Sequence, residues 1–319
     1  MRLLMLLSML ASTLPVSASP PLTGPLGENP AAANSIEQTR DLKVGRDEYD
    51  RMTVAVRVSD SGPYRFLVDT GAERTIISRQ LAGRLGLVAG VPTRMQSVAG
   101  ASNVTTVDIP MIDVSRRRFP VSGAPALEEV HIGADGVLGV DSLASSQVNF
   151  DFKRGVMGIA PSRAPSFVND PTTIVVEARR RHGRLMFTRA NVDGATTVVV
   201  IDTGSQITIG NAALRRRLLG HRPLGEMTEL ETVVGEKMMV ELATVRLLDL
   251  DGVQLKDMRI AFVDSPVFRQ LELDERPAML LGMNALRGFD KVSIDFATRR
   301  VRFVLPESGA NEGYRLALR

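Results

Sequence analysis

The chain has 319 residues, of which 44% are hydrophobic and 24% are charged, with 27 glycines and 17 prolines. This composition excludes a disordered, collagen-like or low-complexity protein, and the length allows two domains of about 150 residues, each able to bury a core. Lys and Arg outnumber Asp and Glu by 39 to 36, there is no long basic block and aromatic residues make up only 4%, so we expect no nucleic-acid partner.

Cysteine is absent, and the three histidines are His131, His182 and His221. Disulfides, thiol nucleophiles, Cys-ligated zinc and iron–sulfur clusters are therefore excluded. The histidines stand in unrelated contexts without an HExxH pattern, and the chain has no Gly-rich phosphate loop. We expect neither a metal nor a cofactor.

Residues 1–18 have the pattern of a signal peptide. Arg2 supplies a positive charge, Leu3 to Leu14 is mostly apolar, and the small residues up to Ala18 suit a signal peptidase. An apolar run of about a dozen residues is short for a membrane span, although an uncleaved N-terminal anchor is the alternative. We expect an exported protein, periplasmic or secreted, with no stable membrane insertion after cleavage.

Residues 19–45, rich in Pro, Ala, Ser and Gly, predict a flexible tether. Strands are then expected from Met52 to Val58 and from Tyr64 to Val68, joined by a turn at Ser59 to Pro63. A short helix is expected from Ser78 to Leu87, which begins with an N-cap type residue.

The second half of the chain predicts a similar series of elements. Strands are expected from Leu185 to Val192 and from Thr196 to Ile201, with a hairpin turn at Asp193-Gly194. A short helix is expected from Asn211 to Leu219. The segment from Pro161 to Pro171, which holds three prolines, marks the boundary between the halves.

Four sequence blocks occur twice, in the same order. The first pair holds Asp69-Thr70-Gly71-Ala72 and Asp202-Thr203-Gly204-Ser205, 133 positions apart (202 − 69). The other pairs are Ser97 to Gly100 with Thr232 to Gly235, Gly136 to Leu143 with Met279 to Leu286, and Val148 to Phe152 with Val292 to Phe296. We infer a duplicated unit. It predicts an N-terminal lobe at 46–163, a C-terminal lobe at 172–306 and a tail at 307–319.

A single Asp-Thr-Gly triplet is typical of a turn after a strand. Here each copy follows an apolar strand, and a Val-Leu-Gly or Leu-Leu-Gly block ends at Gly139 or Gly282, 70 or 80 positions after the aspartate (139 − 69 and 282 − 202). In these blocks the sequence resembles the aspartic proteases of the retropepsin and pepsin group, over roughly residues 46–306. The resemblance implies an all-β, bilobal fold with pseudo-two-fold symmetry and a few short helices.

The resemblance also implies that Asp69 and Asp202 are the catalytic residues. Hydrolysis of a peptide bond without a metal needs one group that takes a proton from water and another that gives one to the carbonyl oxygen. Two carboxyl groups about 3 Å apart cannot both ionise, so such a pair shares one proton, as aspartic protease dyads do. Because the chain carries both aspartates, we expect a monomer to be competent.

By the same resemblance, six neighbouring residues support the two aspartates: Thr70, Gly71, Ala72, Thr203, Gly204 and Ser205. The threonines would hydrogen-bond across the centre, and the glycines would let backbone amides approach the carboxylates. A serine hydroxyl after the triplet could donate to its carboxylate, whereas Ala72 cannot. Under this hypothesis, Ala72→Ser would lower the acidic limb of the pH–rate profile. The alternative is that position 72 is simply packed.

Two flap hairpins are expected at Val98, Ala99 and Gly100 and at Val233, Val234 and Gly235, where the family closes over an extended peptide. The sequence departs from the family here, because Gln96 to Asn103 contains no aromatic residue and a single glycine. The alternative is an ordinary solvent-facing hairpin turn.

The sequence therefore predicts an aspartic endopeptidase that acts on extended peptide or protein segments. Two alternatives stay open. One is a catalytically silent, protease-like protein that binds peptides in the cell envelope. The other is a self-processing enzyme whose tether covers the cleft until it is removed.

Overall fold

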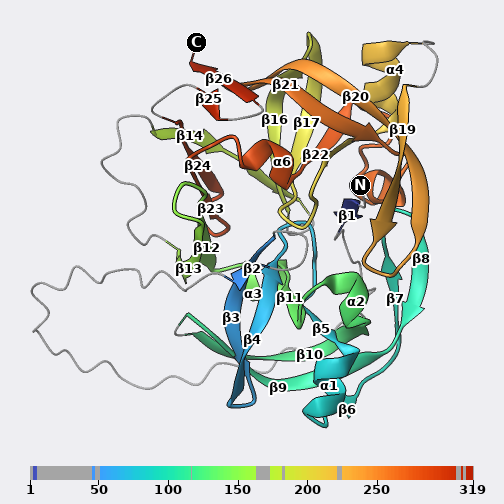
Figure 1. The fold of residues 1–319 in the computed structure, drawn as a ribbon, viewed down its shortest axis with the longest axis vertical. Coiled ribbons are helices and arrows are strands. Elements are labelled where there is room, and N and C mark those ends of the chain that lie inside the picture. Colours follow the sequence, from blue (N-terminus) through green and yellow to red (C-terminus); the bar gives the residue numbers. More distant parts are fainter. Residues whose placement is uncertain are drawn as a thin grey trace, which may run out of the picture.

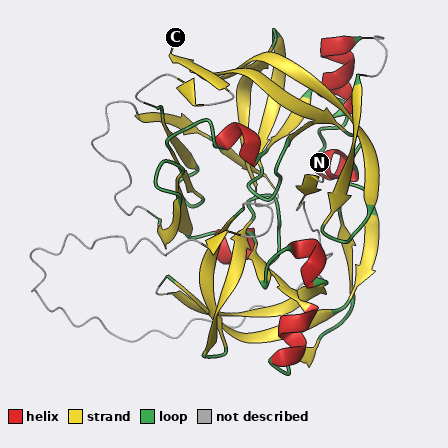
Figure 2. Cartoon of the chain, in the orientation of Figure 1, coloured by secondary structure: helices red, strands yellow, loops and turns green. Residues whose placement is uncertain are grey.

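A computed structural model describes residues 51–115, 117–162, 173–181, 184–220 and 225–306, together with short strands at 3–5, 45–46, 310–311 and 314–318. The rest of the predicted signal peptide and tether, His182, His221, and most of the boundary segment lie outside the described residues. The chain forms two β-barrel lobes with few helices, one below the other in Figure 1. Figure 2 shows the dominance of strand. The expected all-β, two-lobed fold is confirmed.

The N-terminal lobe is one curled sheet with a small hairpin beside it. The sheet runs, in spatial order, through β2 (Gly45–Arg46), β3 (Met52–Val58), β4 (Ser61–Val68), β11 (Gly136–Leu138), β5 (Ile76–Ser78), β10 (Arg117–Leu127), β9 (Thr106–Val114) and β6 (Val88–Ala89). The hairpin pairs β7 (Thr93–Gln96) with β8 (Ala101–Val104).

The turn between β3 and β4 is tighter than predicted. It consists of Ser59 and Asp60, both with positive φ (49° and 63°), while Ser61 to Pro63 belong to β4. Two residues with positive φ match the twist of the flanking strands, and Asp accepts this conformation better than most residues.

The C-terminal lobe repeats this arrangement. Its sheet runs through β1 (Leu3–Met5), β19 (Glu226–Thr232), β20 (Lys237–Leu250), β16 (Arg184–Val192), β17 (Ala195–Ile201), β22 (Ala278–Leu281), β18 (Thr208–Gly210), β21 (Val253–Phe262), β26 (Tyr314–Leu318) and β25 (Ala310–Asn311), with β15 (Arg179–Arg181) paired to β16. The hairpin predicted at Asp193-Gly194 joins β16 to β17.

A third sheet joins the two lobes. It runs through β13 (Val156–Pro161), β12 (Ser146–Asp151), β23 (Lys291–Asp295), β24 (Arg300–Val304) and β14 (Thr173–Glu177). The fourth repeated block supplies its centre, because β12 pairs with its own repeat copy, β23, in antiparallel register. Asn149 lies opposite Ser293, which places the pseudo-two-fold axis at this pair.

Both predicted helices form. They are α1 (Arg79–Arg84), capped by the Ser78 hydroxyl, and α4 (Ala212–Leu219), capped by the Asn211 side chain. The first is shorter than predicted, because Leu85 caps it and Gly86 takes a left-handed φ of 59°. The other helices are α2 (Glu129–Ile132), α3 (Val140–Leu143), α5 (Pro266–Gln270) and α6 (Met283–Leu286). In the described part of the chain, no helix is long and apolar enough to cross a membrane.

The main hydrophobic core runs through both lobes and the shared sheet, where the rings of Phe289 and Phe303 pack at a tilt of 43° with centroids 4.6 Å apart. Burial of these aromatic rings ties the lobes together, because side chains from both lobes contribute to one apolar cluster. The lobes are therefore held in a fixed relation, with the two Asp-Thr-Gly segments facing each other across the axis.

Candidate active site

Each Asp-Thr-Gly segment begins where an apolar strand ends. Asp69 follows β4 and Asp202 follows β17, and their amides donate to the carbonyl oxygens of Leu138 and Leu281 at 3.0 Å in both cases. These acceptors belong to β11 and β22, the Val-Leu-Gly and Leu-Leu-Gly blocks that pair in parallel with β4 and β17. The block found 70 to 80 residues downstream is thus the strand that supports each aspartate.

The two threonines of the triplets hydrogen-bond across the centre. Each backbone amide donates to the opposite hydroxyl, Thr70 N to Thr203 Oγ1 and Thr203 N to Thr70 Oγ1, both at 3.1 Å. Each hydroxyl then donates to a carbonyl of the opposite lobe, that of Ile201 at 2.9 Å and that of Val68 at 2.8 Å. Four reciprocal bonds therefore fix the two loops against each other, as the resemblance implies.

The glycines of the triplets make room for the aspartates. A Cβ on Gly71 would lie 2.6 Å from Asp202 Oδ1, and a Cβ on Gly204 would lie 2.3 Å from Asp69 Oδ2. Both aspartates are completely buried, and each lies against the glycine of the opposite triplet. The absence of a side chain at these two positions is thus what lets the carboxyl groups meet.

The two carboxyl groups lie within hydrogen-bonding reach of each other. Burial raises the pKa of Asp69 to about 6, against the opposing effects of its amide hydrogen bonds and of Arg184. Burial, together with the charge of Asp69, raises the pKa of Asp202 well above its ordinary value. Because ionisation of one carboxyl opposes ionisation of the other, the pair holds one proton over a range of pH.

Backbone amides favour the ionised form of Asp69. Asp69 Oδ1 accepts from the amides of Gly71 at 2.7 Å and Ala72 at 3.0 Å. Asp202 Oδ1 accepts from Gly204 at the longer distance of 3.1 Å, and the Ser205 amide also lowers the pKa of Asp202. The second oxygen, Oδ2, of each aspartate accepts no hydrogen bond from the residues that the structure describes. Two buried acceptor atoms therefore remain, and either can carry the shared proton.

The structure contradicts the hypothesis that the Ser205 hydroxyl donates to the neighbouring carboxylate. The Ser205 hydroxyl donates to the carbonyl of Ile207 at 2.5 Å and not to the Asp202 carboxylate. Ala72 is buried and packed at the equivalent position, with 1% exposure. The difference between alanine and serine therefore acts on local packing, and Ala72→Ser carries no expected shift of the pH profile.

Behind each triplet a threonine supports the loop in the same way. Thr75 Oγ1 accepts from the Gly139 amide and donates to Asp141 Oδ1 at 2.7 Å. In the second lobe Thr208 Oγ1 accepts from the Gly282 amide and donates to Asn284 Oδ1 at 2.8 Å. Neither threonine was predicted as a site residue, although Thr75 and Thr208 recur at the offset of the aspartates.

A buried arginine was also missed. Arg184 begins β16 and reaches across the lobe junction, where its Nε donates to the Gly71 carbonyl at 3.0 Å. Its Nη2 lies 3.8 Å from Glu73 Oε1. Arg51 stands 133 positions earlier (184 − 51), so an arginine at the same place in both repeats was the available signal.

The predicted flap residues lie in hairpin turns, and each turn reaches into the other lobe. Val98 follows β7 and packs in the apolar cluster of the C-terminal lobe, while Val233 follows β19 and packs in that of the N-terminal lobe. Both valines have 1% exposure. Val234 packs at the edge of the same N-lobe cluster, whereas Ala99 is exposed. The two valines are therefore buried in the opposite lobe while Ala99 is exposed, and the flap role of these turns stays a prediction.

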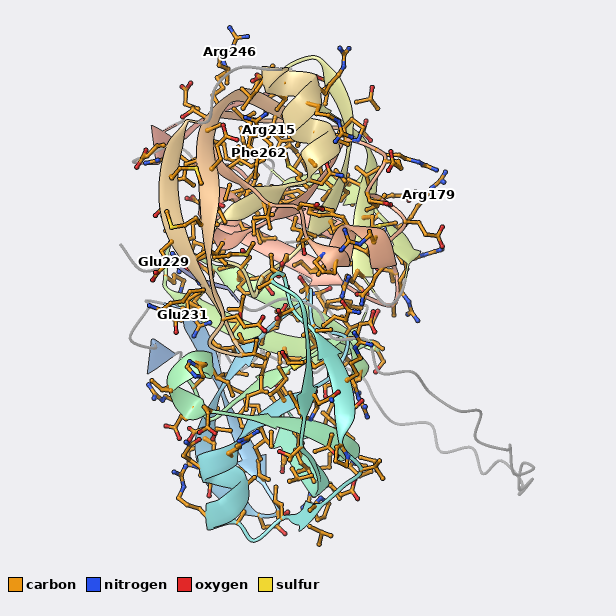
Figure 3. All side chains as sticks on the ribbon, turned by 90° about the vertical axis from the view of Figure 1, so that its right-hand side faces the viewer. Arg179, Arg215, Glu229, Glu231, Arg246 and Phe262 are labelled. Atoms are coloured by element: carbon orange, nitrogen blue, oxygen red, sulfur yellow. The ribbon has the colours of Figure 1, made fainter. Side chains whose placement is uncertain are left out.

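Polar contacts also join the hairpins. Glu236 accepts hydrogen bonds from the Ser97 and Ser102 hydroxyls, both at 3.1 Å. His131 Nδ1 lies 3.5 Å from Glu231 Oε1, and its ring lies against Gly235, which takes a φ of +81°. Figure 3 shows Glu229 and Glu231 where the descending hairpin of the C-terminal lobe approaches the other lobe. The two hairpins thus form one cover across the lobe junction.

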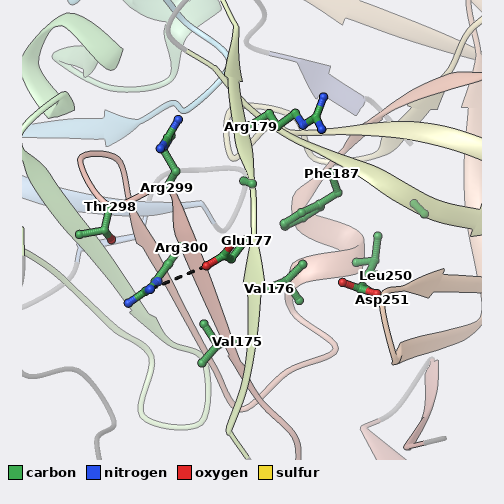
Figure 4. Close-up of a pocket in the computed structure, with 12 residues that line it drawn as sticks. Val175, Val176, Glu177, Arg179, Phe187, Leu250, Asp251, Thr298, Arg299 and Arg300 are labelled. Atoms are coloured by element: carbon green, nitrogen blue, oxygen red, sulfur yellow. Dashed lines mark ion pairs between the residues drawn. The ribbon is translucent and has the colours of Figure 1, made fainter.

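A separate cavity of about 570 Å³ lies between the C-terminal barrel and the shared sheet (Figure 4). Its lining includes Val175, Phe187 and Leu250, together with an ion pair of Arg300 and Glu177 at 3.7 Å. Neither Asp69 nor Asp202 lines this cavity, and no predicted flap residue does, so it is not part of the candidate site.

A family model described as "Aspartyl protease" matches residues 54–142 and 188–285, which together make up more than half of the chain. No curated protein matches. Each matched region contains one Asp-Thr-Gly triplet, its supporting Gly block and one hairpin turn, so the match falls on the two repeats that meet at the axis. On this evidence the chain belongs to the aspartyl protease family, with two copies of the family's unit in one polypeptide.

Proposed function

We propose that the protein is an exported aspartic endopeptidase that hydrolyses peptide bonds of extended segments, with Asp69 and Asp202 as its catalytic pair. The observation that carries the proposal is the burial of two carboxyl groups, within hydrogen-bonding reach, at the axis between two matched lobes. The pair holds one proton and one charge, which is what acid and base catalysis by the same two groups requires.

The hydrogen bonds favour Asp69 as the base and Asp202 as the acid. Asp69 takes a proton from water, whose oxygen attacks the peptide carbonyl carbon, while Asp202 gives its proton to the carbonyl oxygen. A tetrahedral diol results. Asp69 then passes its proton to the leaving nitrogen and Asp202 takes one back from the diol, so the carbon–nitrogen bond breaks and the original protonation returns.

An extended substrate has a strand edge to pair with. Residues Leu3–Met5 pair in parallel with Leu230 to Thr232 at the edge of β19, the strand that leads into the second flap turn. Strand addition provides backbone hydrogen bonds with any sequence, as general peptide binding requires. Leu3–Met5 belongs to the predicted signal peptide, so cleavage after Ala18 would leave this edge to a substrate.

The test uses the mature chain from Ser19 and a mixed peptide library between pH 3 and 8. Asp69→Asn and Asp202→Asn are each expected to lower cleavage by about 10³-fold or more, because each removes one half of the acid–base pair. Asp264→Asn, at a carboxyl with 80% side-chain exposure, is the matched control and should cleave normally. A statine-type peptide, which mimics the tetrahedral intermediate, should inhibit.

The silent peptide-binding alternative predicts a different result. The wild-type chain would bind extended peptides without cleaving them at any pH, and the two Asn variants would bind as well as the wild type. Cleavage that survives both substitutions would contradict the assignment of the catalytic pair.

Export has its own test. Mass spectrometry of the protein recovered from the cell envelope or the medium should find Ser19 as the first residue. Recovery of an intact N-terminus from the membrane fraction would support the uncleaved anchor instead.

A further inference from the structure

Arg184 is a cation buried beside the aspartate pair. Its side chain has 1% exposure. It crosses from the C-terminal lobe to donate to the carbonyl of Gly71, within the N-terminal Asp-Thr-Gly segment. Burying a positive charge is costly unless anions and hydrogen bonds compensate it, so the position calls for an explanation in terms of its neighbours.

The guanidinium group has few direct partners. Neither Nη1 nor Nη2 makes a hydrogen bond to the residues that the structure describes, and neither does Glu73 Oε1. The guanidinium Nη2 lies 3.8 Å from Glu73 Oε1, Nε donates to the carbonyl of Gly71, and the amide of Gly71 donates to Asp69 Oδ1 at 2.7 Å. Glu73 and the aspartate pair are therefore the anions that act on its charge. The charge of Arg184 is therefore divided between Glu73 on one side and the aspartate pair on the other.

We propose that Arg184 is a positioning residue that keeps one negative charge on the aspartate pair, and that Glu73 sets how much of the positive charge of Arg184 the pair receives. The proposal rests on the function proposed above, since it concerns the protonation state that catalysis needs. Arg184 acts through Asp69 and Asp202 and contacts no substrate.

The arrangement widens the pH range over which the pair holds a single proton. Burial raises the pKa of Glu73 to about 7, against the pull of Arg184. In acid, Glu73 is neutral, and the uncompensated charge of Arg184 resists protonation of the remaining carboxylate. Above neutrality, Glu73 is ionised and offsets Arg184, so the shared proton is held more firmly.

The symmetry of the molecule supports a specific role. The repeat counterparts of Arg184 and Glu73 are Arg51 and Gln206. Arg51 is also buried, but it donates to the Ile132 carbonyl within its own lobe, and Gln206 cannot ionise. The fold therefore accepts a neutral residue where Glu73 stands, so the carboxyl group of Glu73 is not required for folding.

The test observes the carboxyl carbons of Asp69 and Asp202 directly, by ¹³C NMR of the mature chain labelled at aspartate, from pH 3 to pH 10. The two Asn variants assign the signals. Arg184→Gln should raise the lower apparent pKa of the pair by about one pH unit or more, and Glu73→Gln should lower the upper one by about as much. Arg184→Lys, which keeps the charge, should stay closer to the wild type.

Glu241→Gln is the matched control, since it breaks another buried carboxylate–arginine pair. Its partner Arg215 lies in the upper part of the C-terminal lobe, away from the junction (Figure 3), and this variant should leave the titration of the aspartates unchanged. If Arg184→Gln does not fold, Glu73→Gln and Arg184→Lys carry the test. A folded Arg184→Gln or Glu73→Gln variant that titrates like the wild type would overturn the proposal.

The measurement needs no substrate, so it separates the two proposals. A chain that cleaves nothing but shows the expected shifts would contradict the proposed function alone. A chain that cleaves peptides with unmoved titrations would contradict the role of Arg184 alone.

Discussion

The two lobes share a hydrogen-bonding frame but differ in charge. Asp141 and Asn284 hold the supporting threonines with the same Oγ1 to Oδ1 geometry, at 2.7 and 2.8 Å, although one side chain is acidic and the other is an amide. Glu73 and Gln206 differ in the same way. The fold therefore requires the acceptor atoms, whereas the charges are free to differ, and the extra carboxyl groups of the N-terminal lobe must be explained by function or by local electrostatics.

The largest effects are expected from substitutions of the two triplet glycines, Gly71 and Gly204. Gly71→Ala and Gly204→Ala should each lower peptide cleavage by about 10²-fold or more, because the new Cβ would displace the opposite aspartate by several tenths of an ångström or more. The two losses should be similar if the lobes are equivalent at the axis. Gly158→Ala, where the added Cβ meets nothing within 4 Å, is the control for cleavage rates. A strong loss from one substitution alone would break the symmetry.

The flap valines test equivalence away from the axis. Val98→Ser and Val233→Ser each remove a buried apolar side chain from the opposite lobe. Each should lower the free energy that holds its hairpin against that lobe by about 1.5–3 kcal/mol. Binding of a statine-type peptide should weaken by about tenfold or more in each variant. Val88→Ser, at a residue with 72% exposure, should bind as the wild type does. Unchanged affinity in both flap variants would show that the closed cover does not contribute to binding.

The acidic groups at the junction predict a stability that falls as pH rises. Burial raises the pKa of Asp69 from 3.8 to about 6 and that of Glu73 from 4.5 to about 7. The folded state therefore binds these protons more tightly than the unfolded state. The contribution of these two groups to the free energy of unfolding is complete below about pH 4 and is lost as pH rises through 6 to 7.

The Tm should accordingly fall by about 5 °C between pH 5 and pH 8, and Glu73→Gln should make this slope smaller. Gln206 already lacks the charge in the other lobe, so the effect belongs to one side of the axis. Differential scanning calorimetry on the mature chain measures it. An equal or steeper slope in the variant would contradict the raised pKa of Glu73.

The smallest effect is expected at Asp141, because its counterpart in the other lobe is already an asparagine, Asn284. Asp141→Asn reproduces the second lobe and should cost less than about 1 kcal/mol in the free energy of unfolding, because the amide oxygen can still accept from Thr75. Urea denaturation measures the change. A loss above about 2 kcal/mol would mean that the N-terminal loop depends on the charge.

The repeats in the sequence marked the residues that meet at the axis. Asp69, Asp202, the cross-centre threonines and both hairpin turns follow from four blocks at a nearly constant offset. Strand bounds such as Met52–Val58 followed from alternation of apolar and polar residues. Periodicity could not predict which strands pair with each other.

The features that were missed all depend on contacts between distant parts of the chain. The shared sheet needs β12 to meet β23, and Val98 and Val233 are buried only because each enters the other lobe. From the sequence, Arg184 is expected to be an exposed charge at the start of a strand. It is buried only because the lobe junction covers it. The direction of the Ser205 hydroxyl depends on the local path of the backbone to Ile207.

The central claim is that Asp69 and Asp202 share one proton. Neutron diffraction from deuterium-exchanged crystals of the mature chain near pH 7, above the pKa of about 6 of Asp69 and below the raised pKa of Asp202, would locate it. The account predicts a single deuteron between the two carboxyl groups, with their oxygens in hydrogen-bonding contact. Two fully ionised carboxylates, two protonated carboxyl groups, or side chains separated beyond hydrogen-bonding reach would contradict it.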